Sequence, residues 1–176
     1  EGEEKICVET HQKLKKKYKK LLTVIIPRHV HRVNDIYKEI LDMGFKVQIH
    51  SKKSKIKKDT DIYLVDTYGE TKSFFKICNT VFLGGSIVNH GGQNPLEPAR
   101  FGCKILHGPN IQNFTEVYRL LNKENLSFKF YNTNQLAKSV NQSLNKNINF
   151  SKKITKLKKI GSNILHNTLT EINYFL

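Results

Sequence analysis

The chain alternates short apolar runs with longer segments in which apolar residues recur every third or fourth position. The first apolar run, Leu21 to Ile26, is partly β-branched and is stopped by Pro27, which is typical of a strand buried on both faces. Helical spacing precedes this run from Glu3 to Lys20 and follows it from Val33 to Gly44. Glutamates open the first helical segment and lysines close it, which favours a helix because these charges complement the helix dipole.

The same alternation continues along the rest of the chain. Further strands are expected at residues 45–50, 61–65, 80–83, 104–107 and 128–131. Further helices are expected at residues 70–78, from 95 onward, at 114–123, at 134–144 and over the closing segment 151–176. Strands that alternate with helices imply right-handed crossovers and a parallel sheet. The predicted fold class is therefore α/β, a Rossmann-like doubly wound parallel sheet at residues 1–150 with a closing C-terminal helix at 151–176.

Charge narrows the choice of partners. The 176 residues include 30 Lys and Arg against 15 Asp and Glu, a formal net charge of +15, and the surplus is almost wholly lysine. A charge of this size indicates anionic partners, so nucleic acid, a nucleotide and an acidic membrane face all qualify. The alternative is a biased genome, in which case the lysine runs are solvated helix faces and a solvated loop.

The cysteines and the apolar runs exclude several classes of protein. Cys7, Cys78 and Cys103 form no C-x-x-C pair, so neither a disulfide framework nor a zinc site is predicted, and a reducing compartment is favoured. No apolar run reaches the roughly 18 residues that a bilayer-spanning helix needs. The acidic opening, residues 1–4, is the opposite of the basic start of a signal peptide.

Ligands of an open parallel sheet bind beyond the carboxyl ends of its strands, so the loops after the strands are the candidate sites. In the first loop Pro27 sets a rigid turn that projects Arg28, whose guanidinium suits a phosphate or a carboxylate. A simple turn with a surface arginine is the alternative. In the second loop a base or sugar could lie against Tyr68 and the free amides beside Gly69. Here the alternative is a turn in which Thr67 caps the following helix.

The third loop is the most informative, because four glycines fall within nine residues, at positions 84, 85, 91 and 92. Such glycine density lets backbone amides cradle a phosphate. Asn94 and Pro95 are typical of the N-cap and first residue of a helix. Glu97, one turn into that helix, can accept hydrogen bonds from two vicinal hydroxyls of a ribose.

Two weaker patterns are set aside. The triplet Asp59-Thr60-Asp61 has the spacing that holds a divalent metal in some glycosyltransferases, but it lies at the amino end of its strand. His29 and His31 lie two residues apart without an identifiable third ligand. No metal site is therefore predicted.

The block GGS-x4-GG-x-NPLEP resembles the donor-binding signature of the 3-deoxy-D-manno-octulosonic acid (Kdo) transferases that act on lipid A. The other loops agree, because PRHVHR resembles the family's PRHPERF and TYGE resembles its TMGE. The segment FGCKILHGPNIQNFTEVYRLL is similar to a further stretch of the family. Val30, His31 and Tyr68 depart from the pattern, and Tyr68 brings a larger ring than the family's methionine. The resemblance runs in order from Glu1 to about Leu144.

The resemblance implies the C-terminal, donor-binding half of a two-domain GT-B glycosyltransferase, with CMP-Kdo as donor substrate and no further cofactor. No catalytic residue is implied in this chain, because the family's general base and acceptor site belong to the N-terminal half. The implied CMP contacts are Pro27, Arg28, Tyr68, Gly69, Glu70, Asn94, Pro95, Leu96 and Glu97.

The resemblance also implies a cellular setting. The acceptor would be a lipid A precursor in lipopolysaccharide biosynthesis, and the lysines would hold the domain peripherally on the anionic cytoplasmic face of the inner membrane. The opening EGEE resembles the segment that follows the domain's first strand. That central strand and the N-terminal acceptor domain are therefore expected to be missing, and the chain alone is expected to be inactive.

Two other functions compete with this interpretation. The first is another GT-B nucleotide-sugar transferase, such as a UDP-sugar enzyme, which shares a ribose-binding glutamate. The second is a basic nucleic-acid-binding module, which would explain the charge. Nucleic acid is not expected as a partner, because the sequence contains no RNP, KH or helix-turn-helix pattern.

Overall fold

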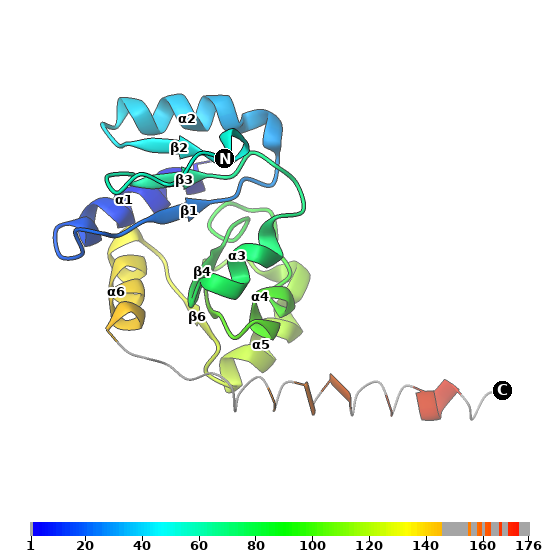
Figure 1. Cartoon of the computed structure of the whole chain (residues 1–176). Helices are drawn as coiled ribbons and strands as arrows, with labels where there is room; N and C mark the ends of the chain where they lie inside the picture. Colours follow the sequence, from blue (N-terminus) through cyan, green and yellow to red (C-terminus); the bar gives the residue numbers. More distant parts are fainter. Residues whose placement is uncertain are drawn as a thin grey trace.

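The computed structural model describes residues 2–145, 155, 158–159, 161–162, 166 and 169–172 (Figure 1). The predicted closing helix at 151–176 lies for the most part outside the described residues. The helices are α1 (Glu3–Lys15), α2 (Val33–Asp42), α3 (Thr71–Ile77), α4 (Leu96–Arg100), α5 (Thr115–Lys123) and α6 (Thr133–Leu144). The strands are β1 (Thr23–Ile25), β2 (Val47–Ile49), β3 (Ile62–Leu64), β4 (Thr80–Leu83), β5 (Lys104–His107) and β6 (Ser127–Lys129).

Every element predicted before residue 145 is present, with β4 and β5 at the predicted bounds. The clearest difference is α1, which ends at Lys15 and not at Lys20. Crowded lysines disfavour a helix through like-charge repulsion. The chain instead forms a tight turn, in which the backbone amide of Leu21 donates to the carbonyl of Tyr18 at 2.9 Å. The Lys15 ammonium closes the turn by donating to the carbonyl of Leu21 at 3.0 Å.

The described strands form two parallel sheets of three, in the orders β1-β3-β2 and β4-β5-β6. Thr23 lies beside Ile62 in the first sheet, and Thr80 lies beside Lys104 in the second. The predicted α/β class with parallel strands is confirmed. The sequence also predicts a gap at the centre of the sheet, where the domain's first strand is expected to be missing. In the described residues β1 and β4 each pair along one edge only, so the strands form two sheets of three. A central first strand between them stays a prediction.

Burial follows this division of the sheet. The middle strands β3 and β5 are buried along their whole length, as strands covered on both faces should be. In β1 only Ile25 is buried, and in β4 only Leu83 is buried. These two apolar strands therefore have the composition of central strands and the exposure of edge strands.

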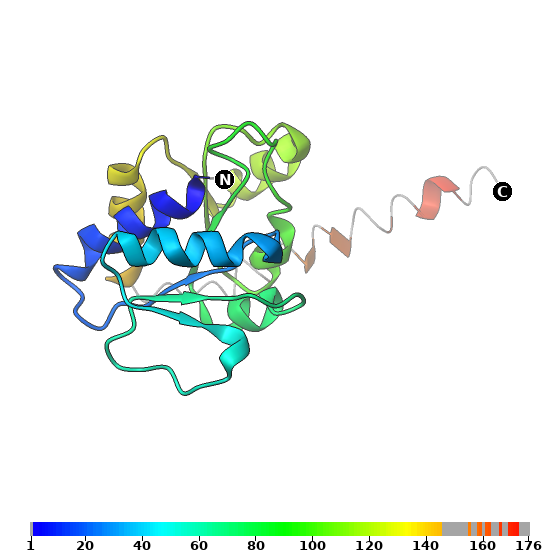
Figure 2. The same cartoon turned by 90° about the horizontal axis from the view of Figure 1, so that it is seen from above.

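Helix α1 joins the two halves of the molecule. It packs against β1 and α2 of the first half and against α6 of the second, so that in Figures 1 and 2 it lies between α2 and α6. The Tyr18 hydroxyl, in the turn that follows α1, donates to the side-chain oxygen of Asn141 at 2.7 Å. The Thr133 hydroxyl donates to the Glu9 carboxylate at 3.0 Å. Polar contacts thus fix α6 along the length of α1.

The core is correspondingly divided into clusters. The first lies between α1, α2 and the sheet of β1, β2 and β3, and its buried members are Val8, Ile25, Val33, Ile36, Ile40, Ile62 and Leu64. The second lies beneath α4 and α5, and its buried members are Leu83, Ala99, Ile105, Tyr118, Leu121 and Leu126. A smaller cluster of Leu106, Phe130 and Leu136 packs α6 onto β5 and β6. Each half of the molecule therefore has its own apolar interior.

Two histidines are buried in these halves. His107 ends β5 with 2% of its surface exposed, its Nδ1 lies 2.7 Å from the carbonyl of Gly108, and its ring packs on Tyr118. His11 of α1 is 1% exposed, and its Nδ1 lies 2.9 Å from the Thr23 hydroxyl. Burial is the largest effect on both imidazoles and lowers the pKa of each, although Asp61 opposes the shift at His11.

We predict that the free energy of unfolding decreases as the pH falls from about 7 to about 5, because an unfolded histidine takes up its proton near pH 6.5 while the buried ones resist it. His107→Asn keeps a donor beside Gly108 but cannot titrate, so this pH dependence should become shallower. Urea unfolding at several pH values measures it. His31→Asn, at an exposed position, is the control, and equal slopes in both variants would contradict the prediction.

Candidate functional site

A pocket of about 390 Å³ lies where the loops after β1, β4 and β5 meet. Because these loops follow the carboxyl ends of parallel strands, this is the edge at which such folds bind ligands. Arg28 comes from the loop after β1 and Asn94 from the loop after β4, so the structure brings together two of the predicted contacts that lie far apart in the sequence. The lining residues are Arg28, His90, Gly92, Gln93, Asn94, Asn113 and Phe114.

The glycines of the loop after β4 are required by its backbone path. Gly85, Gly91 and Gly92 all have positive φ angles, of 69°, 80° and 79°, which other residues rarely adopt. The amide of Gly92 donates to the carbonyl of Gly85 at 2.8 Å and closes the loop on itself. A Cβ atom at Gly91 would also overlap the side-chain amide group of Asn113, which comes from the neighbouring loop.

Ser86 ties this loop to the loop after β5. It is fully buried, and its hydroxyl donates to the carbonyl of Leu83 at 2.6 Å and accepts from the amide of Gly108 at 2.8 Å. The carbonyl of Ser86 accepts from the amide of Asn110 at 2.8 Å. The two loops that form most of the pocket wall are therefore one hydrogen-bonded unit.

Four amides of this loop are directed to a residue that the sequence analysis did not place in the site. The backbone N–H groups of Gly85, Ser86, Ile87 and Val88 donate to the Glu3 carboxylate at 2.5, 3.0, 2.7 and 3.4 Å. The predicted phosphate cradle is thus filled, at these amides, by a carboxylate of the chain itself. The acidic opening of the sequence is the signal, but none of the interpretations that the sequence offers for it connects it with this loop.

The NPLEP segment lies almost as predicted. Helix α4 begins at Leu96, one residue later than expected, with Pro95 at its N-cap position. Asn94 is therefore not the N-cap residue, but its side-chain oxygen still accepts from the amide of Leu96 at 3.0 Å and satisfies one amide at the helix start. Glu97 follows in the first turn and is partly buried. Its carboxylate makes no hydrogen bond or ion pair with any other described residue, which leaves it available to a ligand.

The first loop presents Arg28 on a buried Pro27, as the rigid turn predicts. The Arg28 side chain is exposed, and its guanidinium has no hydrogen-bond or ion-pair partner within the described part of the chain. It lines the same pocket as Asn94 and Asn113. A free guanidinium beside a glycine-rich loop is suited to an anionic group.

The second loop lies apart from the lining of this pocket. Tyr68 is 75% exposed, and Gly69 takes a φ of 84°. The Glu70 carboxylate lies 3.8 Å from Nε2 of His50. Helix α3 has no side-chain cap, so the interpretation of Thr67 as its cap is wrong.

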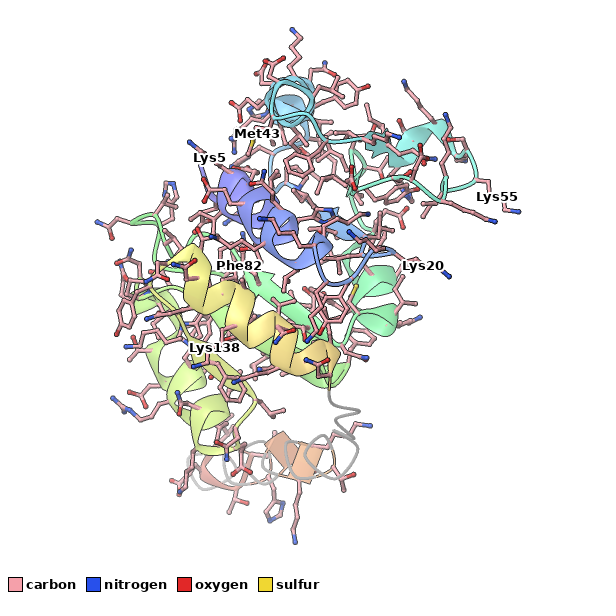
Figure 3. The ribbon with its side chains drawn as sticks, turned by 90° about the vertical axis from the view of Figure 1, so that its left-hand side faces the viewer. Lys5, Lys20, Met43, Lys55, Phe82 and Lys138 are labelled. Atoms are coloured by element: carbon pink, nitrogen blue, oxygen red, sulfur yellow. The ribbon has the colours of Figure 1, made fainter. Side chains whose placement is uncertain are left out.

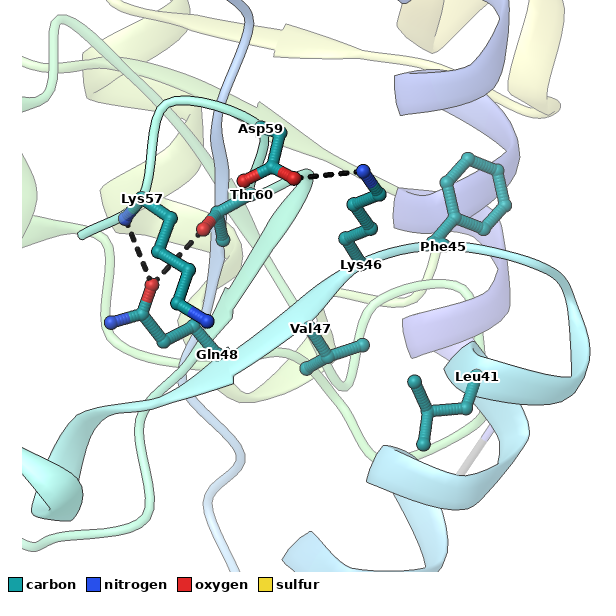
Figure 4. Close-up of a pocket in the computed structure, with 8 residues that line it drawn as sticks. All are labelled: Leu41, Phe45, Lys46, Val47, Gln48, Lys57, Asp59 and Thr60. Atoms are coloured by element: carbon teal, nitrogen blue, oxygen red, sulfur yellow. Dashed lines mark hydrogen bonds and ion pairs between the residues drawn. The ribbon is translucent and has the colours of Figure 1, made fainter. Parts of the chain in front are cut away.

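The triplet that was set aside lies at the opposite, amino edge of the first sheet. There the carboxylate of Asp59 accepts from the Lys46 ammonium at 2.7 Å (Figure 4). Asp61 pairs with Lys15 at 2.9 Å. A second pocket, of about 290 Å³, lies at this edge, and its lining includes Leu41, Lys46, Asp59 and Thr60. Within the described ranges, no group of three or more His, Cys, Asp or Glu residues is placed to hold a metal ion.

The fold is a parallel α/β domain with a pocket at the carboxyl edge of its strands, and comparisons with known proteins narrow the class. The C-terminal CMP-Kdo binding domain of WaaA from Acinetobacter baumannii has the same fold, with a TM-score of 0.81 and 23% identity over 90% of this chain and 82% of that one. No protein-family model matches the chain.

Sequence comparison with curated proteins finds relatives of the same kind. The chain is 35% identical over 120 residues to the 3-deoxy-D-manno-octulosonic acid transferase of Haemophilus influenzae, and 28% identical over 159 residues to that of Aquifex aeolicus. These matches cover 68% and 89% of this chain. The resemblance to the Kdo transferases is thereby confirmed. The chain spans only 28% and 44% of the length of these two relatives.

We predict that Gly108→Ala destabilises the protein, because its Cβ would overlap the backbone carbonyl of Ser86, which holds the two pocket loops together. Overpacking of this kind costs about 1–3 kcal/mol. Urea unfolding measures the loss. Gly161→Ala, whose Cβ would meet nothing within 4 Å, is the control. A Gly108→Ala protein as stable as the parent would refute the close approach.

Proposed function

We propose that this chain is the CMP-Kdo-binding part of a glycosyltransferase that transfers Kdo to a lipid A precursor. The observation that carries the proposal is the pocket at the carboxyl edge of the strands. Arg28 and Asn94 line this pocket together with Gly92 of the glycine loop. The relatives' names and the binding domain named for the neighbouring structure support the choice of donor.

Each available group has a role toward such a donor. The Arg28 guanidinium presents a planar fork that can donate two hydrogen bonds to the phosphate of CMP. Glu97, free of other partners among the described residues, accepts hydrogen bonds from the ribose hydroxyls. Tyr68 lies outside the pocket lining, and its exposed ring offers a flat surface to a base that extends beyond the pocket.

The transfer step needs a second part of the protein. A general base must lie within hydrogen-bond reach of the acceptor hydroxyl, and the described residues that line the pocket include no carboxylate. Glu3 is held by backbone amides and Glu97 is given to the ribose. This chain on its own therefore binds the donor and does not transfer the sugar, and an N-terminal acceptor domain supplies the base and the lipid.

The lysines place this domain on an anionic lipid surface. Lys5, Lys20 and Lys138 project outward on the side formed by α1 and α6, and Lys55 projects from the loop before β3 (Figure 3). No described helix is long and apolar enough to cross a membrane. Attachment to the inner membrane is then peripheral and electrostatic, at about 1 kcal/mol for each lysine near the surface.

Calorimetry with CMP, UDP and a short oligonucleotide tests the proposed donor. We expect CMP to bind in preference to the other two. Arg28→Lys and Glu97→Ala should each weaken CMP binding about tenfold or more, because each removes a charged hydrogen bond worth about 1.5–3 kcal/mol. Arg119→Lys, at an exposed arginine paired with Glu116, is the control. Preference for UDP would favour a UDP-sugar enzyme, and preference for the oligonucleotide a nucleic-acid-binding module.

Vesicle co-sedimentation tests the membrane proposal. Binding should require anionic lipid and should fall as salt rises, because the Debye length shortens from about 10 Å at 0.1 M to about 3 Å at 1 M. Vesicle binding should weaken when Lys5→Gln, Lys20→Gln and Lys138→Gln are combined. Substitution of the acidic residues Asp35 and Glu39 on α2 should not weaken vesicle binding. Binding that is insensitive to salt would assign the lysine surplus to genomic bias.

A further inference from the structure

The Glu3 carboxylate is the internal ligand of an anion-binding turn. It accepts from four successive backbone amides, those of residues 85–88, and Glu3 itself is 9% exposed. A run of consecutive N–H groups directed at one point forms a concave site that favours negative charge. Oε2 accepts from Gly85, and Oε1 accepts from Ser86 and Ile87 with a longer contact to Val88, so both oxygens of the carboxylate are used.

The position of Glu3 in the chain makes this contact a link between distant elements. Glu3 is the first residue of α1, where a negative charge also suits the helix dipole. The loop that it binds follows β4, more than 80 residues later. Gly84 makes room for it, because a Cβ there would lie 2.7 Å from a Glu3 carboxylate oxygen.

Hydrogen bonds lead from this turn to the pocket. The carbonyl of Gly85, whose amide Glu3 holds, accepts from the amide of Gly92, and Gly92 lines the pocket beside Arg28. The carbonyl of Gly91 accepts from the amide of Asn113, another lining residue, at 3.1 Å. Glu3 itself does not line the pocket, so any effect it has on a ligand acts through the loop.

We propose that Glu3 is a positioning residue, whose carboxylate takes the place of a bound anion and fixes the loop of residues 84–92 in the form that shapes the pocket. Without that negative charge the four amides diverge or recruit an anion from solution, because converging N–H dipoles repel one another. The effect on the loop stands by itself, and the effect on donor affinity rests on the proposed function.

Glu3→Gln and Glu3→Ala test the role of the charge. Amide hydrogen exchange without any nucleotide should become about tenfold faster or more at residues 85–88 and at Gly92, as loss of a charged hydrogen bond predicts. Glu9→Gln, on the same helix, removes the charge that accepts from Thr133 and should leave this loop unchanged. Acetate should restore protection to Glu3→Ala, and chloride at equal ionic strength should restore less.

CMP affinity separates the two proposals. If the parent binds CMP, Glu3→Gln should bind it about tenfold more weakly, and Glu3→Asp, which keeps the charge on a shorter side chain, should recover part of the loss. If the parent fails to bind CMP, the proposed donor is wrong, while the exchange rates still decide the role of Glu3. Unchanged exchange at residues 85–88 in Glu3→Gln, or no rescue of Glu3→Ala by acetate, would overturn the inference. If Glu3→Gln and Glu3→Ala do not fold, Glu3→Asp decides it by the same exchange measurement.

Discussion

The structure depends on α1, because this helix connects two sheets that share no backbone hydrogen bond within the described residues. Its sides pack on β1 and on α6, and its first residue, Glu3, holds the loop after β4. Each half has its own apolar interior, so neither core alone fixes the position of the other. The relative placement of Arg28, from one half, and Asn94, from the other, follows from this helix and its end contacts.

The two edges of the sheets use charge in opposite ways. At the amino edge two ion pairs form, one between Asp59 and Lys46 and one between Asp61 and Lys15. Each of these four charges therefore has a partner within the protein. At the carboxyl edge Arg28 has no charged partner among the described residues, and the glycine loop turns its backbone toward the pocket. Uncompensated positive charge beside free space suits an anionic ligand, whereas surface charges that already have partners attract a ligand less and add little to stability.

The predicted donor contacts belong to three loops, which follow β1, β3 and β4. Gly92 closes the loop after β4 on itself, and Ser86 joins this loop to the loop after β5. The pocket wall formed by these last two loops is therefore held by hydrogen bonds within the domain. The apolar edges of β1 and β4, by contrast, are suited to further pairing, since half-buried β-branched strands seldom remain as free edges.

The sequence by itself determined the alternation of strands and helices, because buried strands and amphipathic helices leave different periodicities in the chain. It also predicted the loops that carry Arg28 and Asn94, since glycine and proline constrain the backbone locally. Only the tertiary structure decided that Tyr68 and Glu97 lie outside the pocket lining and that Glu3 fills the amides of the glycine loop. The physical reason is distance along the chain: a carboxylate finds amides 80 residues away only when packing brings them together, and no local pattern records that contact.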